Sequence, residues 1–295
     1  MPVLASLHRP APGHAIAQPG RHAERRYSAG IFSTYSIKVL IALVLASPLL
    51  SLPARAEDPP MFAVASNMMQ VMTEILGRYR HDNATANINL VFGSSGNFAR
   101  QIMQGAPFQM FLSANKQYVD MLMRDNGRVS AYHEFATGRI GYFIPNGSRL
   151  AGKRSLEEIN RALANDAYRR IAIANPEFAP YGIAARQALQ TAGVWALDKK
   201  KLLKGENIAQ AMQYTLAGGV DIGVVPLSYA LLPDIRAQGK FFLIPRDWHD
   251  PIIEYLVLLK QAGPASRTFY EYLLSGKAVP VLKKYGYETA RVAGE

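Results

Sequence analysis

The feature that most constrains the fold is an alternation of short apolar runs and amphipathic segments, which extends from Met61 to Tyr285. Short apolar runs are typical of buried strands, whereas apolar residues three and four positions apart are typical of helices. Their alternation favours an α/β fold. We expect strands at 61–65, 88–92, 110–112, 139–144, 171–174, 220–225, 241–244 and 252–259, and helices at 66–79, 116–125, 156–164, 182–192, 207–216, 265–274 and 279–285, with one more helix directly after Gly96.

The length of the chain and the order of its elements predict two lobes. The chain changes lobe around Gly138, so we assign 57–137 together with 249–295 to lobe 1, and 138–248 to lobe 2. The sequence contains no flexible Gly/Ser linker between them. We therefore expect the chain to cross between the lobes on extended segments, which would form a hinge.

Residues 1–56 are typical of a leader. Residues 39–52 form an apolar run of the length of a signal-peptide core, and Ala54 and Ala56 follow it in the small-x-small arrangement of a cleavage site. We expect cleavage after Ala56 and export to the periplasm. A membrane anchor that is never cleaved is the alternative, although the run is short of the roughly 20 apolar residues that span a bilayer. Residues 1–37 are either an over-long leader or the product of an upstream start codon.

Charge and cysteine content argue against several classes of protein. The leader contributes +5 to the formal net charge of +11, which leaves about +6 for the rest. The basic residues are scattered, and no recognition motif for nucleic acid accompanies them. The chain has no cysteine, which excludes a disulfide framework, a thiol nucleophile and a cysteine-based metal site.

Four junctions at the starts of predicted helices carry donor groups. They are Ala65-Ser66-Asn67, Phe92-Gly-Ser-Ser-Gly96, the segment 175–185 with Tyr181-Gly182, and Glu206-Asn207-Ile208. Helix capping or an ordinary turn would explain each one alone. Ligands of α/β sheets, however, bind at the carboxyl ends of strands, where the first N–H groups of helices are unpaired. If the four junctions converge, they offer hydroxyl and N–H donors without a fixed cation, which suits a fully deprotonated oxyanion.

Catalytic chemistry is not indicated. His81, His133 and His249 lie in polar stretches without the spacing of a zinc site. Ser94 and Ser95 lie in Gly-Ser-Ser-Gly rather than in the G-x-S-x-G elbow of a serine nucleophile. We expect no catalytic residue and no cofactor.

At these junctions the sequence resembles the periplasmic molybdate-binding proteins of ABC transporters. The resemblance covers nearly all of 61–290 and is strongest in FAVASN (62–67), FGSSGNFARQIMQGAP (92–107), FLSAN (111–115), ANPEFAPYGIAARQAL (174–189) and KKYGY (283–287). It implies a type II periplasmic-binding-protein fold, with two α/β lobes joined by two crossing hinge segments. It also implies molybdate or tungstate as ligand, held by hydrogen bonds alone, and an ABC permease in the inner membrane as partner.

The resemblance also implies a set of ligand-binding residues. Ser66 and Ser95 would bind through hydroxyl and N–H, and Asn67, Tyr181 and Ile208 through N–H. The molybdenum of the bound molybdate would be the only metal.

Three departures from the family pattern stand out. Pro226 replaces a tyrosine whose hydroxyl contributes in part of the family, and the hydroxyl of Tyr181 is a substitute. Phe108-Gln109-Met110 stands where the family usually has Ala-Asp and an apolar residue, and Asn115 also replaces an acid. We expect both lost acids near the floor of the cleft, where they would affect lobe packing or selectivity.

The sequence thus predicts a monomeric receptor outside the cytoplasm that captures molybdate or tungstate, and not an enzyme. Two alternatives stay open at this point. One is a binding protein for sulfate, phosphate or a small organic anion, which an Arg or Asp pointing into the site would favour. The other is an enzyme or sensor on the same fold, and an enzyme would show a titratable pair with shifted pKa values in the cleft.

Overall fold

A computed structural model describes residues 58–125, 127–196 and 199–289. The predicted leader at 1–56 and its cleavage site lie outside these residues. Within them, no helix has the length and the hydropathy needed to cross a membrane.

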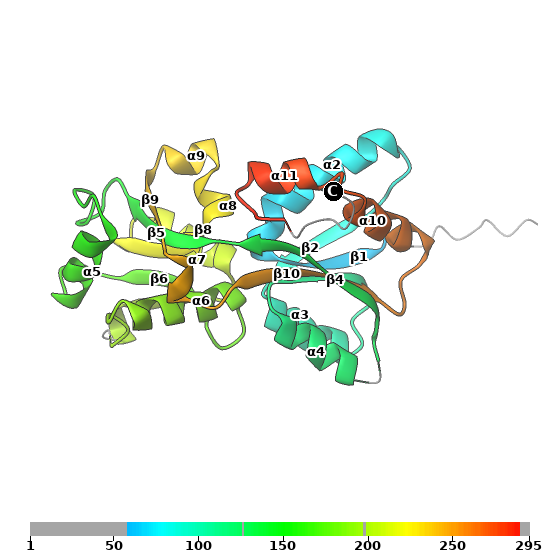
Figure 1. Cartoon of the computed structure of the whole chain (residues 1–295), viewed down its shortest axis with the longest axis horizontal. Helices are drawn as coiled ribbons and strands as arrows, with labels where there is room; N and C mark the ends of the chain where they lie inside the picture. The colour runs from blue at the N-terminus through cyan, green and yellow to red at the C-terminus, as the bar shows by residue number, and fades with distance from the viewer. Residues whose placement is uncertain (1–57, 126, 197–198, 290–295) are drawn as a thin grey trace, which may run out of the picture. The chain divides into compact units, whose positions relative to one another are not determined.

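The first sheet has five strands in the order β2-β1-β3-β10-β4 (Figure 1). The strand β1 is parallel to β2 and β3, whereas β10 is antiparallel to β3 and β4. The strands are β1 (Met61–Ala65), β2 (Asn89–Gly93), β3 (Phe108–Ser113), β4 (Val129–Gly138) and β10 (Ile252–Leu259), and the helices around them are α2 (Met69–Asp82), α3 (Ser95–Met103), α4 (Lys116–Arg124), α10 (Pro264–Leu274) and α11 (Val279–Lys284).

Alternating side chains of β1 bury themselves on opposite faces of this sheet, as the twofold period of a strand requires. Phe62 and Val64 belong to the core formed with α2, α10 and α11. Ala63 belongs to the core formed with α3 and α4. Helices on both faces explain why this strand reads as a continuous apolar run.

The second sheet also has five strands, in the order β7-β6-β8-β5-β9. The strand β6 is parallel to β7 and β8, and β5 is antiparallel to β8 and β9. The strands are β5 (Ile140–Pro145), β6 (Ile171–Ala174), β7 (Leu202–Gly205), β8 (Ile222–Pro226) and β9 (Gly239–Leu243), and the helices are α5 (Leu156–Ala164), α6 (Pro180–Thr191), α7 (Ile208–Leu216), α8 (Leu227–Ala230) and α9 (Pro233–Arg236). Short 3₁₀ turns occupy Ser66–Met68, Lys199–Lys201 and Arg246–Trp248.

The chain passes between the two sheets twice. It leaves the first sheet at the end of β4 and enters β5 after Arg139, and it returns between β9 and β10. The strands β4 and β10 pair along most of their length, from Gly138 opposite Ile252 to Val129 opposite Leu259 (Figure 1). Glycine is required at Gly138, since a Cβ there would clash with the hydroxyl of Tyr181. The predicted two-lobed α/β fold is confirmed, while the boundaries at 57–137, 138–248 and 249–295 stay a prediction.

Several elements differ from their predicted ranges. The strands at 61–65, 171–174 and 252–259 are found as expected. The helix expected from Ser66 begins with a 3₁₀ turn, and α2 starts only at Met69. The strands β4 and β7 and the short helices α8 and α9 were not predicted. The sequence of β4, VSAYHEFATG, mixes polar and apolar residues because this strand forms the edge of its sheet.

Candidate functional site

One small cavity is lined by residues at the ends of strands and the starts of helices, and these residues come from both lobes. It holds about 180 Å³ that protein atoms do not fill, part of it open to solvent. Its lining consists of Ala65, Ser66, Asn67, Gly93, Ser95, Ala179, Pro180, Tyr181 and Ile208. The structure therefore brings together all five residues expected to bind a ligand, from the four junctions that the sequence singled out.

The turn after β1 is held in place by hydrogen bonds to its carbonyl groups. The carbonyl oxygen of Ser66 accepts from the hydroxyl of Tyr229. The carbonyl oxygen of Asn67 accepts from the hydroxyls of Ser228 and Tyr287, both at 3.0 Å. The N–H groups that open a helical turn have no acceptor within it. Ser66 and Asn67 are 3% and 2% exposed, so the N–H groups of this turn are buried with the cavity beside them.

The start of α3 adds Ser95. Ser94 caps this helix by accepting from the N–H of Asn97 at 3.4 Å. The Oγ of Ser95 accepts from the N–H of Ala114 at 3.1 Å. A hydroxyl that accepts in this way still has its own proton to donate. The hydroxyl of Ser95, which lines the cavity, is therefore still available as a donor.

The start of α6 supplies the N–H of Tyr181. Pro180 is the first residue of the helix and has no N–H, as is common at this position. The N–H groups of Gly182 and Ile183 both donate to the carbonyl of Ala179, at 2.8 and 3.0 Å. This leaves the N–H of Tyr181 as the donor of the first turn without an acceptor inside the helix.

The start of α7 positions Ile208 through a reciprocal cap. The N–H of Gln210 donates to the side chain of Asn207 at 3.1 Å, and the N–H of Glu206 donates to the side chain of Gln210 at 2.7 Å. Ile208 follows the cap as the first residue of the helix and lines the cavity. Its N–H is thus another donor without an acceptor inside its helix.

The hydroxyl of Tyr181 has other partners. It donates to the carboxyl of Glu254 at 3.2 Å and accepts from the side-chain amide of Asn67 at 3.2 Å. Burial raises the pKa of Tyr181 well above its usual value, so this hydroxyl keeps its proton. These contacts favour the backbone N–H, rather than the hydroxyl, as the contribution of Tyr181 to a ligand site.

Glu254 is the residue that sequence reasoning missed. It lies in β10, is 1% exposed, and its Oε1 accepts from the amide of Asn67 at 2.7 Å. Its Oε2 is buried without a hydrogen-bond partner among the described residues. Burial raises the pKa of Glu254 to about 8, against the opposing effect of the bonds from Asn67 and Tyr181. The signal in the sequence was a single acid inside the apolar run 252–259.

The cavity lining carries no formal charge. None of its residues is Asp, Glu, Lys, Arg or His. Within the described part of the chain, no three His, Cys, Asp or Glu side chains are close enough together to hold a metal ion. Such a lining can bind an oxyanion through hydroxyl and N–H donors at the positive ends of helix dipoles.

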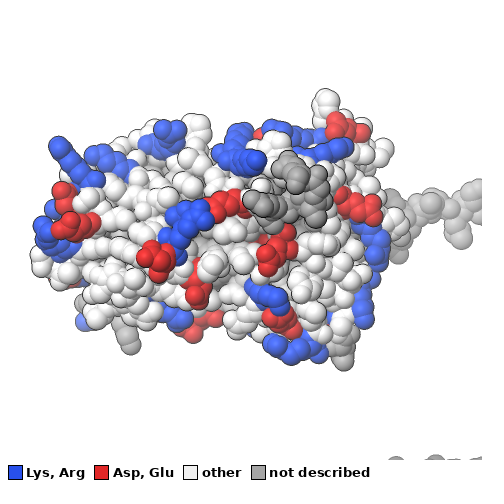
Figure 2. Space-filling view, in the orientation of Figure 1, with Lys and Arg blue, Asp and Glu red and all other residues white. Residues whose placement is uncertain are grey.

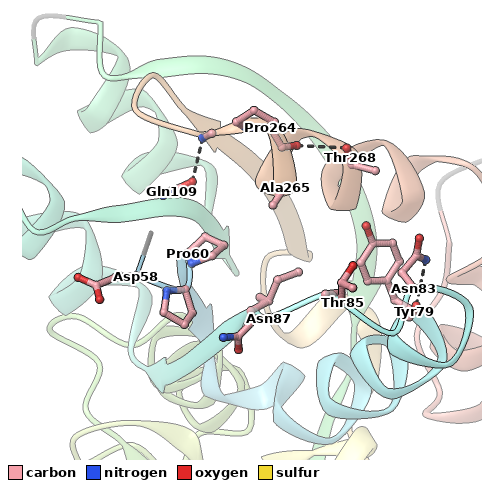
Figure 3. A pocket seen from close by; sticks show the side chains of 14 residues that line it. Asp58, Pro60, Tyr79, Asn83, Thr85, Asn87, Gln109, Pro264, Ala265 and Thr268 are labelled. Carbon is pink, nitrogen blue, oxygen red and sulfur yellow. Dashed lines mark hydrogen bonds between the residues drawn. The ribbon is translucent and has the colours of Figure 1, made fainter. Parts of the chain in front are cut away.

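Gln109 does not lie near the floor of the cleft, where we expected it from the family resemblance. Its Oε1 accepts from the N–H of Gly263 at 2.8 Å and from the hydroxyl of Ser266 at 2.7 Å, at the start of α10. It lines a separate cavity with Pro264 and Thr268 (Figure 3). The expectation that Gln109 lies near the floor of the cleft is wrong, because it is near the beginning of β3 and the site is beyond the end of this strand.

The other two departures have local explanations. The side chain of Asn115 caps α4 by accepting from the N–H of Gln117 at 2.8 Å, a role that an aspartate would also fill. Pro226 ends β8, and the helix after it carries Ser228 and Tyr229, whose hydroxyls hold the carbonyls of the turn after β1.

Comparison with known proteins adds a family to this geometry. The model of the bacterial extracellular solute-binding protein family matches residues 61–288. The molybdate-binding protein ModA of Azotobacter vinelandii is 32% identical over 86% of this chain and 98% of its own length. ModA of Rhodobacter capsulatus is 31% identical over 84% of this chain and 94% of its own.

A solved structure agrees with these relatives. The periplasmic molybdate-binding protein of Azotobacter vinelandii superposes with a TM-score of 0.70 at 26% identity, over 79% of this chain and all of that one. The resemblance to periplasmic molybdate-binding proteins that the motifs indicated is thereby confirmed. The chain belongs to the bacterial extracellular solute-binding protein family.

Proposed function

We propose that this protein captures molybdate or tungstate in the cavity lined by Ser66, Asn67, Ser95, Tyr181 and Ile208, and delivers it to an ABC permease. The observation that carries the proposal is the convergence of four junctions from two lobes on one uncharged cavity. Relatives that are named as molybdate-binding proteins support the choice of anion.

A site that offers only donors selects the charge state of its ligand. A fully deprotonated oxyanion accepts at every oxygen. A protonated oxyanion would turn its own O–H toward another donor, which costs roughly 1–3 kcal/mol. Size separates the remaining dianions, since a cavity fitted to molybdate or tungstate stretches the hydrogen bonds to the smaller sulfate.

The setting of this receptor is part of the proposal. We infer that the chain is exported to the periplasm after cleavage behind Ala56, acts as a monomer, and uses neither a cofactor nor a resident metal. We also infer that it is not an enzyme and does not bind nucleic acid. On the face shown in Figure 2, basic and acidic side chains are interspersed, which supports the last point.

The first experiment is thermal unfolding of the full chain with molybdate, tungstate, sulfate and phosphate. A ligand at a thousand times its dissociation constant stabilises by about 4 kcal/mol, a shift of several degrees. We expect this shift with molybdate and tungstate and little shift with sulfate. No shift with either of the first two would overturn the proposal, and a shift with sulfate or phosphate instead would reassign the anion.

A site variant and a matched control locate the binding. Ser95→Ala removes a hydroxyl donor to a charged ligand, which is worth about 1.5–3 kcal/mol, so we expect roughly a 10- to 100-fold loss of affinity. Thr268→Ala removes a hydroxyl of similar size from the cavity near Gln109, where Thr268 donates to the carbonyl of Pro264 (Figure 3). Equal loss of affinity in both variants would contradict the placement of the ligand.

A further inference from the structure

The carboxyl of Glu254 lies directly behind the anion site. Asn67 lines the cavity, and its side-chain amide donates to Oε1 of Glu254 at 2.7 Å. The hydroxyl oxygens of Tyr181 and Tyr287 lie 3.2 and 2.9 Å from the same amide nitrogen, whose two protons are shared among these three oxygens. The hydroxyl of Tyr181 in turn donates to Oε1. Glu254 therefore orders two residues whose backbone N–H groups belong to the site, one from each lobe.

Every side chain bonded to Glu254 is neutral. Its Oε2 has no hydrogen-bond partner among the described residues. An ionised carboxylate would bury a negative charge with one oxygen unpaired, which costs far more than burying a neutral acid. The donors Asn67 and Tyr181 both reach the same oxygen, so they relieve this cost only in part.

Charged groups on the neighbouring elements have partners of their own. Across β4, Glu254 faces Ala136, and the nearby Glu134 accepts from the hydroxyl of Tyr255 at 3.3 Å. At the crossing between the sheets, Arg139 pairs with Glu288 at 3.6 Å. No Lys, Arg or His among the described residues forms an ion pair with Glu254.

We propose that Glu254 is a positioning residue of the anion site, that it must carry its proton for tight binding, and that anion binding drives proton uptake by this carboxyl. The inference rests on the proposed function of the site. The anion and an ionised Glu254 would be like charges separated by the side chain of Asn67, in a buried region that screens them little. Binding must therefore stabilise the protonated form, and by linkage protonation must strengthen binding.

The raised pKa of Glu254, about 8 in this structure, sets the range in which the effect is visible. Below pH 7 the carboxyl keeps its proton with or without the anion. Above pH 8 the protein without ligand loses this proton, and the affinity falls by up to about tenfold per pH unit. Molybdate stays a dianion across this range, so the ligand itself contributes no titration.

The test is calorimetric titration of the full chain with molybdate between pH 6 and pH 9.5. Each titration is run in two buffers of different ionisation enthalpy, which counts the protons taken up. We expect the wild-type affinity to fall above pH 8 with uptake of up to one proton. Glu254→Gln keeps an acceptor for Asn67 and Tyr181 but cannot ionise, so it should bind with constant affinity and without proton uptake.

Glu134→Gln is the matched control, since it neutralises an acid of the adjacent strand that bonds Tyr255 instead of the site. It should keep the wild-type pH profile. Glu254→Ala removes the acceptor as well as the charge, and should weaken binding at every pH. Rescue of affinity by Gln but not by Ala separates positioning from the bare loss of a carboxyl.

Three results would overturn the inference. They are a wild-type affinity that is flat between pH 7 and pH 9.5, binding without proton uptake above pH 8, or a Glu254→Gln variant with the wild-type pH profile. The first two need no variant, so misfolding of the substituted chains cannot hide the answer. Absence of molybdate binding at every pH would instead overturn the proposed function, and the inference with it.

Discussion

Among the residues that the structure describes, two carboxyl groups are almost completely buried, and they have opposite surroundings. Asp221 precedes β8 and is 0% exposed. It accepts from the backbone N–H of Arg149 at 3.1 Å, from the N–H of Arg169 at 2.7 Å, and from the guanidinium of Arg169 at 2.9 Å. Glu254 has only neutral donors, and both reach one of its two oxygens.

The comparison shows that depth of burial does not determine the charge of an acid. Burial opposes the ionised form of both groups. At Asp221 the hydrogen bonds and the charge of Arg169 outweigh burial and lower the pKa below its usual value. At Glu254 burial prevails and raises the pKa to about 8. The first acid therefore fastens a loop to its sheet, while the second accepts from two neutral side chains and keeps one oxygen unpaired.

The largest expected effect is the loss of the ion pair in the second sheet. Asp221→Ala leaves two backbone N–H groups without their acceptor, which costs about 1–3 kcal/mol for each, while the guanidinium of Arg169 is 42% exposed and can turn to water. Urea unfolding at pH 7 measures it, with Asp234→Ala on the exposed start of α9 as control. A loss of stability no greater than that of the control would show that water replaces these contacts. The contrast between Asp221 and Glu254 would then not hold for stability.

The next effect is the pH dependence of stability at Glu254. Its folded pKa of about 8 lies above the ordinary 4.5, so the folded state binds more protons between these values. The contribution of Glu254 to the free energy of unfolding should then be complete below pH 4.5 and fall by up to about 1.4 kcal/mol per pH unit until pH 8. Glu254→Gln should remove this slope without ligand present. Urea unfolding of both proteins at pH 6 and pH 7 measures the difference, and identical slopes would contradict the raised pKa.

A smaller effect is expected when the hydroxyl of Tyr181 is removed. Tyr181→Phe takes one donor from Glu254 and one acceptor from Asn67, at a cost of about 1–2 kcal/mol in stability. The backbone N–H remains, so the affinity for molybdate should fall less than tenfold, roughly the weight of one indirect contact. A loss of several hundredfold would place the hydroxyl on the anion.

The smallest effect is expected far from both acids. Gln109→Ala takes the acceptor from the N–H of Gly263 and the hydroxyl of Ser266 at the start of α10. Because Gln109 itself lines the cavity of Figure 3, its truncation lets a water molecule take the place of the lost acceptor. We expect a loss of about 0.5–1 kcal/mol in stability and an unchanged affinity for molybdate. Thermal unfolding and calorimetric titration check both values. Weaker binding of molybdate would show that Gln109, which departs from the family pattern, affects the site after all.

Most of the fold could be predicted from the sequence. Buried strands are short continuous apolar runs, whereas amphipathic helices have apolar residues three and four positions apart. The strand 252–259 is an apolar run and was predicted to the residue. The strand β4 was missed, since it lies at the edge of its sheet and its exposed positions, such as His133 and Glu134, break the apolar pattern. The strand β7 was missed because it follows a lysine run and covers only Leu202–Gly205.

The candidate site divides in the same way. Its donors were predicted because each lies where a predicted strand or loop leads into a predicted helix, which the local sequence indicates. The structure adds Ser94 and Asn207 as caps and Pro180 as the first residue of its helix. The partner of the site, Glu254, was not found, because its role depends on contacts to residues 187 and 73 positions away.

The sequence by itself determined the α/β alternation, the two lobes and the donor groups at four helix starts, since these depend on periodicity and capping within a few residues. Only the tertiary structure decided that the four starts meet in one cavity, that Gln109 lies at the other end of its strand, and that a neutral acid stands behind the site. The physical reason is that the pKa of Glu254 and the role of each donor are set by burial and by partners from distant segments, which no local pattern records.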